Sequence, residues 1–166
     1  AADGEVTYTS SNPKMATVDE NGLVTAVLKG RVIITAVVKA DKKSYKAQLQ
    51  LNIIRPVTAV TVNTAKLPVY DAADEKVSPF LTARENADEN TMPVLLLPVK
   101  KRLTLPAAAE PKDASNAALT FASGDESIFT AVKNNITVVA PGEAILTVAS
   151  VSNPEIMTRY RVLVVQ

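Results

Sequence analysis

The sequence predicts an all-β fold of two sandwich-like units, the first of them incomplete within this chain. Short runs of β-favouring residues recur at regular spacing between turn residues, and no long window has the apolar spacing of an amphipathic helix. In addition, the stretch from Val6 to Ala36 recurs in altered form near the C-terminus, which predicts two copies of one structural unit. At one constant offset the matched residues are Tyr8 with Phe121, Ser10 with Ser123, Asn12 with Asp125, Met15 with Ile128, Thr17 with Thr130, Asn21 with Asn134 and Leu23 with Ile136, and after a one-residue deletion Gly30 with Gly142, Ile33 with Ile145 and Thr35 with Thr147.

The first copy is expected to begin with a strand at Val6–Ser10, where Val, Tyr and Ser alternate with threonines. Alternation with period two indicates a strand with one buried face. A short second strand is expected at Met15–Val18. The residues Asp19–Gly22 favour a tight turn into Leu23–Val27, because Asn and Gly tolerate positive φ and so allow the chain to reverse as a hairpin.

Two longer strands are expected to complete this copy. The run Arg31–Lys39 is too apolar to be half exposed and is typical of a central strand. After a solvated turn at residues 41–43, the segment Tyr45–Ile54 alternates apolar and polar residues almost perfectly. It therefore predicts a strand with one dry face and one wet face.

A domain boundary is expected at Arg55–Pro56, which divides the chain into residues 1–55 and 56–166, because proline favours a short, semi-rigid connection. Residues 57–63 and 67–70 are expected to form a split first strand of the second domain. Residues 71–99 have no counterpart before the first repeat and are interpreted as a hairpin-like insertion, with a strand at Val77–Ala83 and an apolar stretch at Pro93–Val99. The remaining strands are expected at residues 101–108, 119–123, 128–132, 136–139, 144–151 and 158–165.

The amino-acid composition argues against several classes of function. The 18 Lys and Arg nearly balance the 17 Asp and Glu, so there is no excess positive charge to neutralise nucleic acid or to draw the chain to an anionic membrane. No apolar run approaches the roughly 20 residues of a membrane helix. The chain has no His and no Cys, and therefore lacks the commonest general base and the commonest transition-metal ligands. The opening residues AADGEV contain no predicted signal peptide.

The strand spacing, the tight turns and the two copies favour immunoglobulin-like sandwiches. The motifs YTSSNP at 8–13, ATV at 16–18, NGLVTA at 21–26 and IITA at 33–36, together with the turn glycine Gly30, resemble the bacterial Ig-like domain group 2, or BIG2, family. Residues 57–165 resemble it more weakly, through TFASGDES at 120–127 and the turn Pro141–Gly142. The aromatic residue at the first landmark is usually Trp in the family, whereas here it is Tyr8 or Phe121. The resemblance implies extracellular tandem modules of bacterial surface adhesins, secreted enzymes or phage virions, with no family-wide catalytic residues.

The first copy departs from this family because it begins at what should be the third strand. A sandwich that lacks two strands exposes core residues and open edges. We therefore expect the first domain to be completed by β-strand addition, either from a neighbouring chain or from the insertion at residues 77–99.

Two kinds of ligand site are weighed from the residue types. Calcium, which prefers oxygen ligands, has weak candidates in Asp71, Asp74 and Glu75 and in Glu85, Asp88 and Glu89, and a weaker one in Asp19–Asn21. An ordinary solvated turn explains each cluster more simply. Glycan stacking needs exposed aromatic rings, for which Tyr70 and Phe80 are the candidates, with Tyr45 and Tyr160 also conceivable. Two opposed carboxylates in a cleft, as glycoside hydrolysis requires, are not expected in a small sandwich with short loops.

The sequence therefore predicts a non-enzymatic structural or adhesion module of a bacterial cell surface or a phage particle. Its expected partners are proteins or neighbouring Ig-like modules, with surface glycans as a further class, and it is expected to need no cofactor. The alternative, from a different class, is an accessory carbohydrate-binding module of a secreted enzyme.

Overall fold

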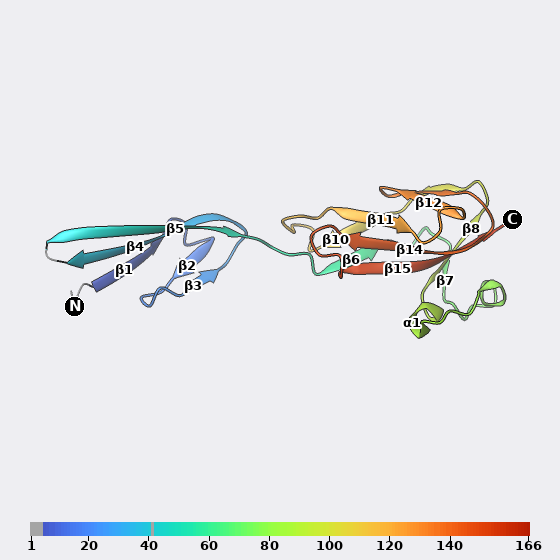
Figure 1. Cartoon of the computed structure of the whole chain (residues 1–166), viewed down its shortest axis with the longest axis horizontal. Helices are drawn as coiled ribbons and strands as arrows, with labels where there is room; N and C mark the ends of the chain where they lie inside the picture. The colour runs from blue at the N-terminus through green and yellow to red at the C-terminus, as the bar shows by residue number, and fades with distance from the viewer. Residues whose placement is uncertain (1–4, 41) are drawn as a thin grey trace. The chain divides into compact units, whose positions relative to one another are not determined.

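The structure, a computed structural model, describes residues 5–40 and 42–166 and divides the chain into two compact units, Ala1–Arg55 and Pro56–Gln166 (Figure 1). The expectations for residues 1–4 and for Asp41 lie outside the described residues. Almost all regular structure is β, which confirms the fold class expected from the sequence. Within the described ranges, the helices are all too short and too polar to cross a lipid bilayer.

The first unit contains one three-stranded sheet and one two-stranded hairpin. The antiparallel sheet has the order β1-β4-β5, so the predicted central strand is indeed central. The hairpin joins β2 to β3 through a turn in which the Asp19 Oδ1 accepts hydrogen bonds from the backbone N–H of Asn21 and of Leu23, at 2.9 and 2.8 Å. Gly22 supplies the positive φ of this turn, at 84°. The strands are β1 (Glu5–Ser10), β2 (Ala16–Val18), β3 (Val24–Ala26), β4 (Gly30–Ala40) and β5 (Lys43–Ile53).

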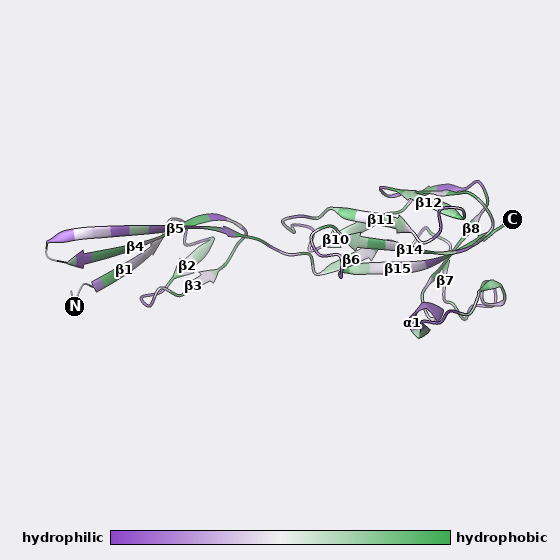
Figure 2. Ribbon diagram, in the orientation of Figure 1, coloured by the Kyte–Doolittle hydropathy of each residue, from purple (hydrophilic) through white to green (hydrophobic). Residues whose placement is uncertain are grey.

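The first unit has a small core. Of its described residues, 5–40 and 42–55, only Ala16, Val32 and Ile34 are buried, and five apolar residues pack partly buried against them. The prediction that β5 has one dry face is wrong for residues 45–49, because both faces of the strand are exposed there, including the hydrophilic start that is purple in Figure 2. Apolar and polar residues do alternate along β5, but within the described residues no element covers its apolar face at residues 45–49.

The second unit is a fuller sandwich of three sheets. A five-stranded sheet has the order β11-β14-β15-β8-β7, a three-stranded sheet has the order β12-β13-β9, and β10 pairs with β6. All strand pairs are antiparallel except β15 with β8, which run parallel. The strands are β6 (Ala59–Val62), β7 (Val69–Tyr70), β8 (Val94–Pro98), β9 (Arg102–Thr104), β10 (Ala107–Glu110), β11 (Leu119–Ser123), β12 (Phe129–Val132), β13 (Asn135–Val138), β14 (Gly142–Ser150) and β15 (Met157–Val165).

The core of the second unit lies between these sheets and is aliphatic apart from two aromatic rings, those of Phe129 and Tyr160. Burial raises the pKa of the Tyr160 hydroxyl above its ordinary value, because the ionised form loses its hydration. The fully buried members of this core are Val60, Leu95, Leu97, Leu105, Phe129, Ile136, Val138, Ala144, Leu146, Val148, Tyr160, Val162 and Val164.

Two expectations for residues 71–99 are wrong. The range Val77–Ala83 forms no strand. It contains the 3₁₀ helix η1 (Ser78–Phe80), because Pro79 at the helix start fixes φ and cannot donate to a strand ladder. The apolar stretch at 93–99 is no outlying hairpin arm either, since β8 is an inner strand of the five-stranded sheet. Between them lies the short helix α1 (Ala87–Asn90), capped by the Asn86 side chain.

The two units share a pattern of pairing. Strands β1-β4-β5 and the β2–β3 hairpin of the first unit pair in the same order as β11-β14-β15 and β12–β13 of the second. The matched turns agree as well, since the Met15 carbonyl accepts hydrogen bonds from Val27 and Leu28 as the Ile128 carbonyl does from residues 139 and 140. The second unit has five further strands, β6 to β10, that have no equivalent among the described residues of the first.

Candidate functional site

Residues 71–93 cover the outer face of the five-stranded sheet, the face turned away from the sandwich core (Figure 1). Val77 is completely buried against Val94 and Leu163, and partly buried apolar residues that include Leu81 surround this second, smaller core. This segment is therefore packed onto the sheet and presents a surface of its own.

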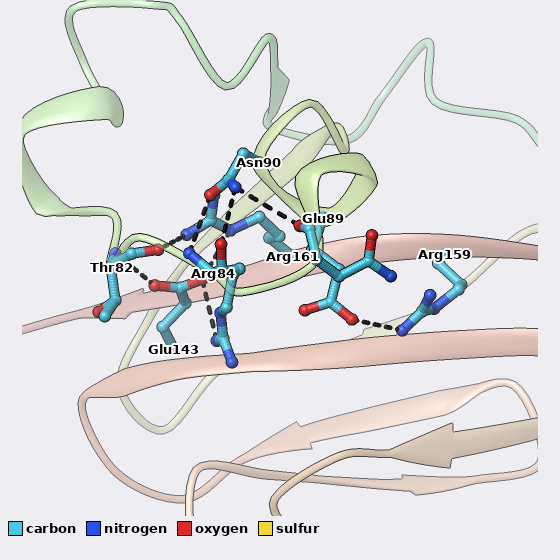
Figure 3. A network of polar contacts seen from close by, with 8 residues as sticks. Thr82, Arg84, Glu89, Asn90, Glu143, Arg159 and Arg161 are labelled. Atoms are coloured by element: carbon cyan, nitrogen blue, oxygen red, sulfur yellow. Dashed lines mark hydrogen bonds and ion pairs between the residues drawn. The ribbon is translucent and has the colours of Figure 1, made fainter.

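A network of charged groups fastens this segment to the sheet (Figure 3). Arg161 on β15, whose side chain is only 2% exposed, donates from Nε to Oε1 of Glu143 on β14 at 2.6 Å. The Glu143 side chain, 6% exposed, also accepts from Arg84 Nη2 at 3.1 Å and from the backbone N–H of Thr82 at 2.8 Å. Arg161 Nη2 in turn donates to the carbonyl oxygen of Thr82. One buried carboxylate thus links two strands to the covering segment.

The environment of Glu143 determines its protonation. Burial alone would raise the pKa of this carboxyl, but the hydrogen bonds from Arg161, Thr82 and Arg84 favour the charged form and outweigh it. The net effect is a pKa below the ordinary value. Glu143 is therefore an anion at neutral pH, and it is a poor general acid.

The helix α1 is held by a second set of contacts. Arg159 Nη2 lies 3.0 Å from Oε1 of Glu89, and Asn90 exchanges hydrogen bonds with the backbone of Arg84 at 3.0 Å in both directions. These side chains lie close to the Glu143 network in Figure 3. The Nε of Arg84 is buried and has no hydrogen-bond partner. The polar groups of the network mostly bind one another, an arrangement that fixes the loop on the sheet.

The two aromatic candidates lie in this covering segment but in different surroundings. The Tyr70 ring packs half-buried in the outer core, with Lys76 Nζ 5.3 Å from its centroid in a cation–π contact. Phe80, on η1, is 64% exposed and does not belong to that core. Of the other two rings, Tyr45 is exposed on β5, whereas Tyr160 is buried in the sandwich core.

The structure places the acidic candidates in turns. The Oδ1 of Asp71 accepts from the N–H of Ala73, and that of Asp74 accepts from the N–H of Lys76, each at 2.9 Å. Glu75 is exposed beside them. Among residues 5–40 and 42–166, there is no group of three or more Asp or Glu side chains arranged to hold a metal ion. The Asp19 carboxylate likewise serves its own turn, and Glu89 is paired with Arg159.

Sequence reasoning missed the Glu143 network. The available signal was a charged residue at Arg161, directly before the apolar run Val162–Val165, in a strand whose residues 160–164 are all buried. A buried arginine needs a carboxylate partner. Glu143 is its diagonal neighbour on β14, two residues before Ile145, which pairs with Arg161 in the register.

A second candidate surface is the apolar face of the first unit. Leu49 on β5 is 59% exposed, and Leu51 and Ile53 on the same face are only half-buried. Among the described residues, β5 pairs with β4 alone, so its other edge presents unpaired backbone groups. An apolar face beside an open edge is a surface suited to another strand.

The antiparallel sheets and their pairing in the described residues are those of the immunoglobulin-like β-sandwich class. Residues 1–47 match the model of the family described as "Bacterial Ig-like domain (group 2)", so the family resemblance expected from the sequence is confirmed in the first unit.

Solved structures with a similar arrangement are distant from this chain. Domains 4 and 5 of the S-layer protein SbsC are 14% identical, with 98% of this chain and 71% of that chain covered and a TM-score of 0.44. The C-terminal 282-residue fragment of intimin, in complex with the translocated intimin receptor (Tir) intimin-binding domain, is 14% identical, with 98% and 52% covered and a TM-score of 0.42. Extracellular domains 3–5 of Drosophila OTK are 14% identical, with 98% and 51% covered and a TM-score of 0.34. No curated protein matches the sequence.

Proposed function

We propose that this chain is a non-enzymatic structural and adhesion module, displayed on the exterior of a bacterial cell or a phage particle. The observation that carries this proposal is the match of residues 1–47 to the bacterial Ig-like domain family. Its partners are proteins or neighbouring Ig-like modules, and a strand from a neighbouring chain completes the first unit. The alternative source of that strand, the insertion at 77–99, is wrong, because β8 pairs within the second unit and residues 77–83 form no strand.

The use of the polar groups supports a structural role. The most buried charged residues, Arg161 and Glu143, bind each other and the covering segment, and the sandwich core consists of hydrophobic residues. The pKa of Glu143 is lowered and both of its carboxylate oxygens accept hydrogen bonds from the protein, which is typical of a structural ion pair.

The test is exposure on intact cells or particles of the source organism. An antibody raised against residues 56–166 should label them without permeabilisation, while an antibody against a cytoplasmic protein should not. Label that appears only after lysis contradicts the proposal.

One observation favours the alternative, an accessory carbohydrate-binding module. Phe80 is a large aromatic ring, 64% exposed, on a short helix supported by a packed segment, and exposed rings of this kind stack on sugars. Glycan-array binding that is lost in Phe80→Ala and kept in Val132→Ala supports the alternative, because Val132 on β12 is similarly exposed, at 68%. Loss of binding in Tyr70→Ala counts only if the melting temperature is unchanged, since Tyr70 packs in the outer core.

A further inference from the structure

A cleft of about 500 Å³ lies between the five-stranded and the three-stranded sheet of the second unit. Its wall before β7 is a turn that contains Lys66 and Pro68, and the Leu96 N–H fixes this turn to β8 by donating to the Pro68 carbonyl at 2.9 Å. The volume falls within the roughly 300–1,000 Å³ of ordinary ligand sites. The floor consists of aliphatic side chains, among them Leu67, Leu97 of β8, Leu103 of β9 and Val165 of β15.

One side of this cleft is an open sheet edge. Within the described residues, β9 pairs with β13 alone. The N–H of Leu105 and the carbonyl of Lys101 form hydrogen bonds toward β13. In an antiparallel ladder only every second residue bonds to a given neighbour, so the backbone N–H and C=O groups of Arg102 and Thr104 point to the open edge. The edge therefore offers two donors and two acceptors to another strand.

The rim of the cleft is cationic. Lys66, Lys101 and Arg102 line it and are exposed, and no Asp or Glu is among the lining residues. Among residues 5–40 and 42–166, none of these three cations takes part in an ion pair. The 18 Lys and Arg of the whole chain are nearly balanced by 17 Asp and Glu, so the positive charge here is a local feature. A ligand that combines apolar surface with negative charge complements this cleft.

We propose that this cleft binds an extended peptide of a partner protein, in which acidic and aliphatic residues alternate. The peptide adds antiparallel to the edge of β9, since antiparallel pairing is slightly the more stable per residue. Leu103 packs against the sandwich core, whereas Arg102 and Thr104 are exposed. The peptide residue opposite Leu103 therefore turns an aliphatic side chain into the cleft, and its two neighbours turn acidic side chains outward to the cationic rim.

This inference rests on the proposed function, because it names the chemistry of a protein partner. Its tests use purified residues 1–166, so they are separate from the test of display on cells or particles. Peptide binding by a protein that is absent from the exterior contradicts the proposed function alone. Surface display without peptide binding contradicts this inference alone.

The first test titrates the ¹⁵N-labelled protein with the end-blocked peptide SELELES. The amide resonances of Arg102–Thr104 should shift saturably, and the affinity should fall as the salt concentration rises. The peptide SKLKLKS, which keeps the aliphatic residues and reverses the charge, should bind at least about tenfold more weakly. Equal binding of the two peptides, shifts centred on β5 instead of β9, or the absence of a saturable shift overturns the proposal.

The second test changes the rim of the cleft. Lys101→Glu combined with Arg102→Glu should lower the affinity for SELELES by at least about tenfold. Lys14→Glu combined with Lys112→Glu makes the same change in net charge at exposed positions that do not line the cleft, and it should leave the affinity unchanged. An equal loss in both double variants overturns the site, because it shows only a general attraction between opposite charges.

The third test examines strand pairing without altering the protein. In an antiparallel complex the amides of the peptide's Glu residues face β9, and those of its Leu residues face away. N-methylation of the Glu amides should therefore abolish binding, whereas N-methylation of the Leu amides should preserve it. Equal binding of both methylated peptides overturns strand addition, and a loss confined to the Leu-methylated peptide overturns the antiparallel arrangement. Sodium octanoate, an amphipathic anion without a peptide backbone, should not displace SELELES, and displacement at equal concentration assigns the cleft to a small amphiphile and overturns the peptide.

Discussion

Replacement of Glu143 by Gln should destabilise the second unit by about 3 kcal/mol, the low end of the cost of breaking a buried ion pair by removing one partner. The variant keeps the size of the side chain but removes its charge and one of its two accepting oxygens. Arg161 then stays 2% exposed without a carboxylate at 2.6 Å, and either Arg161 or the Thr82 N–H loses its acceptor. Arg84 adds little, because its side chain is 29% exposed and water screens its charge.

The assay is urea unfolding followed by the NMR resonances of β14 and β15, which report on the second unit alone. The control is Glu126→Gln, an exposed carboxylate in the turn before β12, where the change should stay within about 0.5 kcal/mol. A loss below about 1 kcal/mol for Glu143→Gln, or a loss equal to that of the control, refutes the view that this carboxylate fastens residues 71–93 to the sheet.

The same carboxylate makes stability depend on pH. The folded-state pKa of Glu143 lies below its ordinary value of 4.5, so the charged form is favoured by folding. Its contribution is fully present above that ordinary value and is lost as the pH falls through the lower, folded-state pKa. In Glu143→Gln the loss of stability between neutral pH and acid should be smaller than in the wild-type protein.

Three further predictions concern the core, a turn and calcium. Phe129→Ala should cost about 3–5 kcal/mol in urea unfolding, because the ring is completely buried, whereas Val132→Ala on the same strand should be near neutral. Gly142→Ala should lower the free energy of unfolding by about 1–3 kcal/mol, because φ is 148° and a Cβ would lie 2.8 Å from Ile128 Cδ1. A melting temperature equal to that of the wild type would count against this backbone strain. The melting temperature should be the same in EDTA and in millimolar calcium, because Asp71 and Asp74 already accept hydrogen bonds from their own turns; a rise with calcium would reveal a site there.

Much of the fold could be predicted because local patterns were strong. The apolar run at Arg31–Lys39 lies within the central strand β4, and Asp19–Gly22 forms the expected hairpin turn. The segment at Val77–Ala83 was misread because its apolar residues support two outcomes. Val77 and Leu81 flank a 3₁₀ helix and pack on the outer face of the five-stranded sheet. This tertiary contact leaves no periodic pattern in the local sequence.

The candidate site was harder to foresee for a physical reason. Glu143 and Arg161 lie far apart in the sequence and meet only through the register of β14 and β15, and Arg84 and Thr82 reach them from a loop without periodicity. Alternation in β5 was read correctly, but whether a face is buried depends on what covers it. The exposed Leu49 shows that an alternating pattern identifies the apolar face of a strand but does not identify the element that covers this face.

The parallel pairing of β15 with β8 also bears on how the second unit is made. Residues 94–98 are synthesised well before residues 161–165. The earlier strand β7 gives them one short antiparallel neighbour, but their longer, parallel neighbour comes only with β15. Because domains emerge from the ribosome from their N-terminal end, β8 and the segment before it must wait with their aliphatic side chains uncovered until the last strand has been released. Closure of this unit is thus a late event in translation, set by its last ten residues.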